Sequence, residues 1–292
     1  MTTRLGVVAL VLGVVFAGTG GAHAATDSFL RPPHFYLSLG DSLSQGVQPD
    51  AEGHSVETDQ GYADGLFQME RSSFPRLHLV KMGCPGESTE TMMHGGICSY
   101  AQGSQLAQAV HFLRHHRKNT VFVTLDIGAN NVDGCLHDGQ VDQQCISDGL
   151  DAVQADVPVI VAALNAALGS HGTSQMVGMR YYDPYLAFYL DGPDGQALAA
   201  LSLQLTNLFN FILQSAYQAL GWKVANVSFA FQTNDTTDTV DYPPYGTIPV
   251  NVANICTYTW MCADPPVGPN IHANAAGYQL IAQVFAGQIT GP

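Results

Sequence analysis

The chain has 292 residues, with 10 basic and 24 acidic side chains and a formal net charge of −14. This acidic balance argues against electrostatic binding to nucleic acid or to an anionic membrane surface. The length is ample for one large domain with a real core, and no internal repeat, low-complexity tract or linker divides it.

The N-terminus has the pattern of a secretory signal peptide. Arg4 supplies a basic region, Leu5–Gly18 is an apolar stretch, and Ala22-His23-Ala24 is a small-x-small cleavage site. The alternative is an uncleaved anchor helix, which the short apolar stretch disfavours. We therefore expect cleavage after Ala24 and export from the cell.

Residues 25–292 carry 9 basic and 24 acidic side chains, hence a net charge of −15, and we expect them to form a single domain. No later segment is apolar for long enough to predict an integral membrane span. The run Val157–Leu168 comes closest, but Pro158 and Asn165 interrupt it.

Apolar runs alternate with helical patterns along this domain. The runs predict strands, of which the last is the weakest: Phe35–Leu39, Leu77–Lys81, Val121–Ile127, Gln175–Tyr182 and Lys223–Val227. The helical patterns lie between and after them: Gly61–Arg71, Ser104–His116, Leu150–Leu168, Gln196–Leu220 and Ala273–Gln288. This alternation predicts a parallel α/β sheet of about five strands, with helices on both faces.

Three of the predicted strands end in glycine-containing turns with polar groups. They are followed by Gly40-Asp41-Ser42, by Gly83-Cys84-Pro85-Gly86 and by Gly128-Ala129-Asn130-Asn131. Ligands bind outside the carboxyl ends of the strands in such sheets. A hydroxyl, backbone amides and a carboxamide are therefore expected to meet at one edge.

A nucleophilic serine needs a base, and His272 is the best candidate. It directly precedes the last predicted helix, on a loop where it can face that edge. His111 and His115 have a helical spacing that can bind a metal, but no carboxylate completes a metal-binding motif. We therefore expect no metal and no other cofactor.

The order Gly-Asp-Ser-Leu (40–43), Gly86, Asn130 and His272 resembles the four blocks of the SGNH, or GDSL, hydrolase superfamily. The runs "IGANNVDGC", "YYDPYL" and "NIHANAAGY" are similar to its secreted actinobacterial branch. The resemblance implies a flavodoxin-like three-layer α/β/α sandwich and a serine esterase or lipase. An α/β-hydrolase is disfavoured, because the chain has no Gly-x-Ser-x-Gly elbow.

The resemblance also implies a role for each matched residue. Ser42 would be the nucleophile and His272 the base, while the amides of Ser42, Gly86 and Asn130 would form the oxyanion hole. Each residue has a plainer alternative: Ser42 as a helix cap, Gly86 and Asn130 as turn residues, and His272 as an ordinary loop histidine.

One position departs from the family pattern. Asn270 stands where related sequences have an Asp that orients the imidazole and stabilises its charged form. Three interpretations stay open: Asn270 orients His272 as a neutral group, a backbone carbonyl does so, or Asp264 moves in from the same loop. A second departure is Asn131, where Asp is common.

Six cysteines in an exported chain predict disulfides, although six allow 15 pairings. Their local grouping favours three short-range bonds: Cys84–Cys98, Cys135–Cys145 and Cys256–Cys262. A zinc site is disfavoured because no Cys-x-x-Cys occurs.

These observations predict a secreted, monomeric esterase or lipase that acts on a small-molecule or lipid ester. Because of Asn270, the alternative is a cell-envelope or binding protein that keeps the fold with impaired catalysis. The acyl group and the alcohol are not fixed by the sequence. The aromatic segments Tyr181–Tyr189 and Tyr242–Tyr258 are candidates for lining an acyl site.

Overall fold

The structure is a computed structural model that describes residues 2, 32–137, 140–169 and 174–291. Met1–Pro32 and Pro33–Pro292 are two separate units, and the second holds all the elements described below. The predicted signal peptide, residues 1–24, lies outside the described residues apart from Thr2. Its cleavage, and the division of the chain into a signal and one domain, stay predictions.

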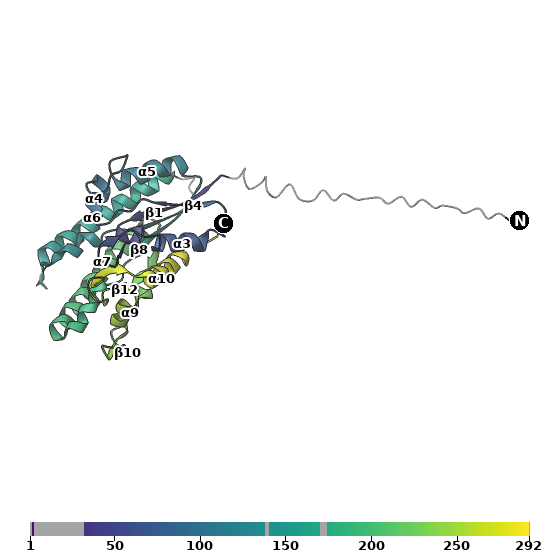
Figure 1. The fold of residues 1–292 in the computed structure, drawn as a ribbon. Helices are drawn as coiled ribbons and strands as arrows, with labels where there is room; N and C mark the ends of the chain where they lie inside the picture. The colour runs from purple at the N-terminus through teal and green to yellow at the C-terminus, as the bar shows by residue number, and fades with distance from the viewer. Residues whose placement is uncertain (1, 3–31, 138–139, 170–173, 292) are drawn as a thin grey trace. The chain divides into compact units, whose positions relative to one another are not determined.

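A five-stranded parallel sheet with the order β4-β1-β5-β8-β9 forms the centre of the second unit (Figure 1). Each strand matches a predicted one to within two residues, so the parallel sheet is confirmed. The order reverses at β1, which has β4 on one side and β5 on the other, and ligands bind near such reversals. The bounds are β1 (His34–Gly40), β4 (Leu77–Lys81), β5 (Thr120–Asp126), β8 (Gln175–Arg180) and β9 (Lys223–Asn226).

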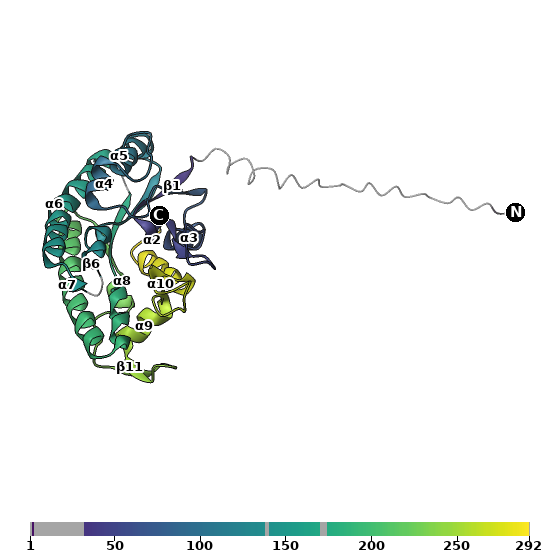
Figure 2. The same ribbon diagram turned by 60° about the vertical axis from the view of Figure 1, so that its left-hand side comes forward.

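Helices cover both faces of the sheet, as Figure 2 shows. One face carries α3 and α10, which pack against each other, and the other carries α5, α6 and α7 in succession. The inner strands β1 and β5 are largely buried between these layers, which explains their continuous apolar runs. The predicted three-layer α/β/α class is therefore confirmed. The bounds are α3 (Tyr62–Glu70), α5 (Gln105–His116), α6 (Gln143–Leu168), α7 (Pro193–Ala219) and α10 (Ala275–Ala286).

Shorter elements fill the connections. The short helices are α2 (Ser42–Gln45), α4 (Thr89–His94), η1 (Ala129–Asn131), η2 (Asp133–Cys135), η4 (Pro184–Asp191), α8 (Val227–Ala230) and α9 (Val250–Tyr258). The paired short strands are β2 (Gln48–Pro49) with β3 (Ser55–Val56), β6 (Leu136–His137) with β7 (Gln140–Val141), β10 (Thr239–Asp241) with β11 (Thr247–Pro249), and β12 (Thr259–Trp260) with β13 (Asn270–Ala273).

The two longest helices begin earlier than the sequence pattern predicts. Helix α6 begins at Gln143, seven residues before the predicted start, because the side chain of Asp142 accepts the N–H of Cys145 and caps the helix there. Helix α7 begins at Pro193, whose fixed φ suits a first helical position. Pro158 lies inside α6 without ending it.

Both of these helices have the length and apolar composition of a membrane span. We expected no segment after the signal peptide to be apolar for long enough to span a membrane. By length and composition alone this expectation is wrong, because α6 continues through Pro158. Within the fold, 39% of the apolar window of α6 and 22% of that of α7 is buried. The two helices pack against each other, and α7 also contacts β8 and β9.

Three disulfides join the locally grouped cysteines: Cys84–Cys98, Cys135–Cys145 and Cys256–Cys262. The first closes the loop after β4, and the second closes the β6–β7 hairpin. The third ties the end of α9 to the segment that leads into β13. All three thus constrain connections that border the site described next.

Candidate active site

The turn after β1 places Ser42 at the carboxyl edge of the sheet. Asp41 caps the short helix α2, because its side chain accepts the N–H of Leu43, and Ser42 is the first helical residue. Gly40 has a φ of +136°, and a Cβ there would lie 2.0 Å from the backbone oxygen of Asp126. Only glycine fits this position, so the geometry of the turn requires the glycine of the Gly-Asp-Ser sequence.

His272 reaches Ser42 from the other end of the chain. Its Nε2 lies 2.8 Å from the Ser42 Oγ, which is hydrogen-bonding distance for a hydroxyl that donates to the imidazole. His272 is part of β13, which pairs with β12 and directly precedes α10. The structure therefore brings together the serine and the histidine that the sequence singles out.

Asn270 orients the imidazole. Its Oδ1 accepts the backbone N–H of His272 at 3.0 Å and lies 2.8 Å from the Nδ1 of the same residue. A backbone N–H can only donate, so the amide oxygen must face His272. Nδ1 then carries the proton, and Nε2 is left free to accept from Ser42. The Nδ2 group donates to the Ser55 Oγ at 3.4 Å.

Asp264 is exposed on the loop before β13, and its backbone oxygen accepts the N–H of Gly268. Within the described residues, no hydrogen bond joins its carboxylate to His272. Of the three sequence interpretations, the geometry is that of Asn270 as a neutral orienting group.

Burial lowers the pKa of His272 to about 4. The cause is loss of solvation of the charged ring, which is mostly enclosed by protein. An imidazole with this pKa is neutral, and so able to accept a proton, at all pH values well above 4. The geometry thus favours the basic form of His272 and offers its charged form no carboxylate partner at Nδ1.

Asn130 is on η1, after β5, and lines the same pocket as Ser42 and His272. One N–H of its side-chain amide donates to the backbone oxygen of Glu87 at 3.0 Å, which fixes the amide and leaves its second N–H available. Gly86 directly precedes Glu87 and has a φ of +83°. A Cβ on Gly86 would meet no atom closer than 4.0 Å, so the space beside its backbone is open.

Asn131, the second departure from the family pattern, has a different task. Its Oδ1 accepts the backbone N–H of Thr89 and its Nδ2 donates to the Thr89 hydroxyl, at 3.0 and 2.9 Å. These bonds tie η1 to the start of α4. Asn131 therefore positions the loop that carries Asn130.

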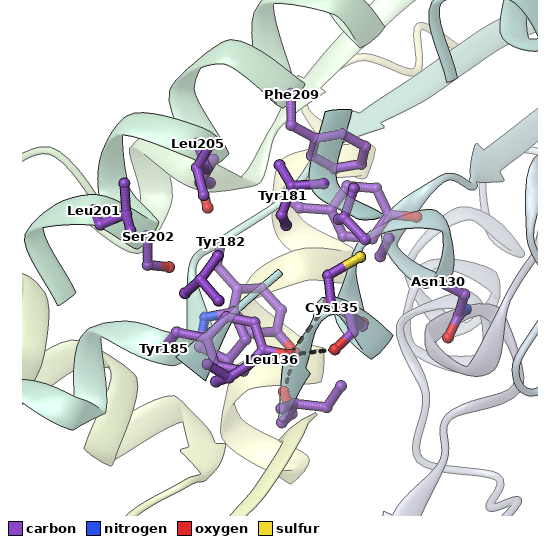
Figure 3. A pocket seen from close by; sticks show the side chains of 18 of the residues that line it. Asn130, Cys135, Leu136, Tyr181, Tyr182, Tyr185, Leu201, Ser202, Leu205 and Phe209 are labelled. Atoms are coloured by element: carbon purple, nitrogen blue, oxygen red, sulfur yellow. Dashed lines mark hydrogen bonds between the residues drawn. The ribbon is translucent and has the colours of Figure 1, made fainter. Parts of the chain in front are cut away.

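The pocket beside Ser42 is mainly apolar (Figure 3). Tyr181, Tyr182 and Tyr185 line one part, as their aromatic segment suggests, whereas the described pocket contains no residue of the segment 242–258. The sequence interpretation missed most of the remaining wall. It consists of residues on α7, the β6–β7 hairpin and α6: Leu198, Leu201, Leu205, Phe209, Leu136, Val141, Ile146 and Leu150. The apolar residues on α7 recur every three or four positions, and this helical spacing is the signal that could have revealed the α7 part of the wall.

The charges around the pocket are acidic. Among the described residues that line it, none is Lys or Arg, and two are aspartates, Asp41 and Asp133. Burial, with a contribution from the negative charge of Asp41, raises the pKa of Asp133 to about 7. The Tyr185 hydroxyl donates to the Asp133 carboxyl at 3.4 Å. The pocket therefore suits a neutral, apolar group rather than an anion.

Known proteins share the fold and parts of the sequence. The sequence model of the GDSL-like Lipase/Acylhydrolase family matches residues 38–280. No curated protein sequence matches significantly. Similar solved structures include an extracellular lipase from Streptomyces rimosus, with 17% identity and a TM-score of 0.56 over 88% of this chain and all of that one.

A phospholipase A1 from Streptomyces albidoflavus has 18% identity and a TM-score of 0.54, again over 88% of this chain and all of that one. A lipase from a goat rumen metagenome has 16% identity and a TM-score of 0.57, over 87% and 98% of the two chains. At these identities the structural likeness establishes the fold, and the sequence match establishes the relationship. The chain belongs to the GDSL-like lipase/acylhydrolase family.

Proposed function

We infer that this protein is an exported ester hydrolase, in which Ser42 attacks the ester and His272 transfers the proton. The observation that carries this proposal is the 2.8 Å contact between the Ser42 Oγ and the His272 Nε2 at an apolar pocket. Family membership supports acyl-ester hydrolysis at the level of the family. The three disulfides are compatible with an extracellular location.

The reaction follows from the tautomer that Asn270 sets. The Ser42 oxygen bonds to the ester carbonyl carbon while its proton moves to the His272 Nε2. The tetrahedral intermediate collapses to an acyl-serine, and the leaving alkoxide takes the proton from His272 as the alcohol departs. Water then attacks the acyl-serine, gives its proton to His272, and releases the acid as Ser42 is reprotonated.

Negative charge develops on the carbonyl oxygen during both halves of the reaction. The proposed donors to it are the backbone N–H groups of Ser42 and Gly86 and the free side-chain N–H of Asn130. The open space beside Gly86 supports this, as does the anchored amide of Asn130. Loss of one such donor typically costs about 3–4 kcal/mol of transition-state stabilisation.

The acyl chain is the group that fits the pocket. Its wall is formed by Leu, Val and Ile side chains from α6, α7 and the β6–β7 hairpin and by aromatic side chains, and the described residues that line it include two aspartates and no Lys or Arg. A neutral acyl chain gains from burial against such a wall, whereas an anionic one would be repelled. The proposed substrates are therefore esters with an uncharged, apolar acyl chain.

The test compares hydrolysis of short-chain aryl esters by the wild type, Ser42→Ala and Ser73→Ala. Ser73 is an exposed serine between α3 and β4, so its variant is a matched control. We expect Ser42→Ala to lose about 10⁴-fold or more in kcat, and Ser73→Ala to keep wild-type activity. Equal, background-level rates in all three proteins would instead support a binding or cell-envelope protein with an impaired site.

A further inference from the structure

Behind the nucleophile turn lies a pair of buried carboxyl groups that the reaction above does not use. Asp126 is the last residue of β5, and Gly40, at the end of β1, is its partner in the sheet register. Asp41 follows Gly40 directly. The exposed fraction is 1% for Asp41 and 0% for Asp126, and both side chains accept backbone N–H groups of the same short turn.

Asp126 holds both ends of the turn that carries Ser42. Its Oδ2 accepts the backbone N–H of Ser44 at 3.2 Å and that of Asp41 at 3.4 Å. Its backbone oxygen accepts the same Asp41 N–H at 3.1 Å. The hydroxyl of Tyr62, on α3, donates to Oδ1. One side chain thus ties residues on either side of Ser42 to the central strand of the sheet.

Asp41 completes the support from within the turn. Its Oδ1 accepts the N–H of Leu43 at 3.0 Å, and its Oδ2 accepts the Tyr181 hydroxyl at 3.1 Å. The Ser44 hydroxyl donates to the Asp41 backbone oxygen at 2.7 Å. We call Asp41 and Asp126 together the carboxyl pair.

Two carboxylates that are buried this deeply and bonded to the same short turn repel each other when both are ionised, because no solvent screens their charges. Burial and the neighbouring charge of Asp41 raise the pKa of Asp126 well above its usual value. The titratable groups that face the pair from the surrounding elements are acids and phenols: Tyr36 on β1, Tyr62 on α3, Glu87 after β4, Asp133 on η2, Tyr181 and Tyr182 after β8, Tyr217 on α7 and Tyr278 on α10.

We propose that Asp126 is a positioning residue for the nucleophile, and that the carboxyl pair holds the Ser42 turn in its working geometry only while it retains one proton. The shared proton lets the two carboxyl groups stay side by side. When it is lost, the two negative charges repel each other and pull on opposite parts of the turn. The proposal rests on the function inferred above, since Ser42 is positioned for that reaction.

Loss of the proton would also act on the oxyanion. The backbone N–H of Ser42 is one of its proposed donors, and it lies between the N–H groups that Asp126 and Asp41 bind. A second negative charge behind this turn opposes the charge that develops in front of it. Both effects lower kcat at high pH and leave binding of the acyl chain against the apolar wall of the pocket largely unchanged.

The test is the pH dependence of kcat and KM for Asp126→Asn, Asp126→Ala and the wild type. Asparagine keeps the shape and cannot ionise, so we expect kcat at neutral pH within about tenfold of the wild type. The fall of kcat at alkaline pH should move upward by about one pH unit or more, or disappear. Asp126→Ala should lose kcat at every pH with little change in KM.

Asp183→Asn is the matched control. Asp183 is also buried, but it bonds to the Ser202 hydroxyl and the N–H of Tyr185 and does not touch the Ser42 turn. Its removal should leave the alkaline fall where it is in the wild type. An Asp126→Asn enzyme whose alkaline fall coincides with that of the wild type, or an Asp126→Ala enzyme with wild-type kcat, would overturn the proposal.

A second measurement needs neither a variant nor activity. Carbon-13 NMR of the wild type, labelled at the aspartate carboxyl carbons, should show one carboxyl of the pair still protonated at pH 7. Absence of such a signal would overturn the proposal even if the variants failed to fold. If Ser42→Ala retained wild-type hydrolysis, the inferred function would fall instead, and the NMR titration would still report on the shared proton.

Discussion

Two sets of hydrogen-bonded side chains flank Ser42. The set in front of it, on the pocket side, is neutral, and the set behind it, on the side of the sheet, is acidic. In front, the His272 Nδ1 faces the uncharged amide oxygen of Asn270 at 2.8 Å. Behind, Asp41 and Asp126 place two carboxyl groups within the fold, both bonded to the turn that carries the serine. In the proposed reaction, negative charge beside His272 would stabilise the imidazolium, and the group there is neutral. Negative charge behind Ser42 would oppose the developing oxyanion, and the two groups there are acids.

The comparison shows that orientation and charge are separable tasks in this site. Asn270 provides the orientation of a triad Asp, because its oxygen is held toward His272, but it cannot stabilise the imidazolium. The carboxyl pair provides orientation as well, and does so with its charge reduced by a proton. On both sides of Ser42, then, hydrogen bonds set the geometry. On neither side are all the groups charged, because Asn270 is neutral and the carboxyl pair keeps one proton.

Among the variants that test this comparison, Asn270→Ala is expected to change kcat the most. Removing the amide leaves the His272 Nδ1 without its acceptor, so the ring is free to take the wrong tautomer and to rotate. We expect kcat to fall by about 10³-fold, somewhat less than the ~10⁴-fold loss from a wrong tautomer in the serine-protease example. A rate within about threefold of the wild type would show that another group, such as a backbone carbonyl, orients His272.

Much of this fold and site could be predicted from the sequence, because the strands are continuous apolar runs and the site residues follow them in short turns. The Gly40–Ser42 turn is recognisable for that reason, and His272 is recognisable because it directly precedes the last predicted helix. The carboxyl pair is not, since Asp126 reads as the polar end of a strand until the register places it beside Gly40. The α7 wall of the pocket depends on how that helix packs, which helical spacing suggests but does not fix.

The next effect is smaller and opposite in sign. Asn270→Asp adds a carboxylate that stabilises the imidazolium, so kcat should rise by about tenfold and not by the ~10⁴-fold of the protease example, because the tautomer is already correct. The same charge raises the pKa of His272 from about 4. The fall of kcat/KM at acid pH, expected near pH 4 in the wild type, should therefore move toward neutral pH in the variant.

Two outcomes of the pH profiles would contradict this account. A wild-type acid fall near the ordinary imidazole pKa of about 6.5 would show that burial does not control His272. A profile that is identical in wild type and Asn270→Asp would show that the new carboxylate does not face the ring. Asn274→Asp, on the cap of α10, adds the same charge away from the imidazole and serves as the control.

The carboxyl pair also makes stability depend on pH. The pKa of the pair is higher in the folded protein than in the unfolded chain, where it is about 4. The pair therefore contributes its full share to the free energy of unfolding below about pH 4, and this share is lost as the pH rises through the folded-state pKa. Each pH unit between the two values costs about 1.4 kcal/mol. Asp126→Asn should therefore show a flatter dependence of unfolding free energy on pH than the wild type, measured by urea denaturation. Parallel curves for the two proteins would contradict the raised pKa.

The smallest expected effect concerns Ser55, which accepts the Nδ2 group of Asn270 at 3.4 Å. If the Ser55 hydroxyl fixed the amide, its removal would release the ring almost as Asn270→Ala does. The backbone N–H of His272, however, already requires the oxygen of Asn270 at 3.0 Å, and no side-chain substitution removes that donor. Ser55→Ala should therefore lower kcat by only about twofold, with an unchanged acid fall. A loss above about tenfold would show that the outer hydroxyl, and not the main chain, holds the neutral side of the site.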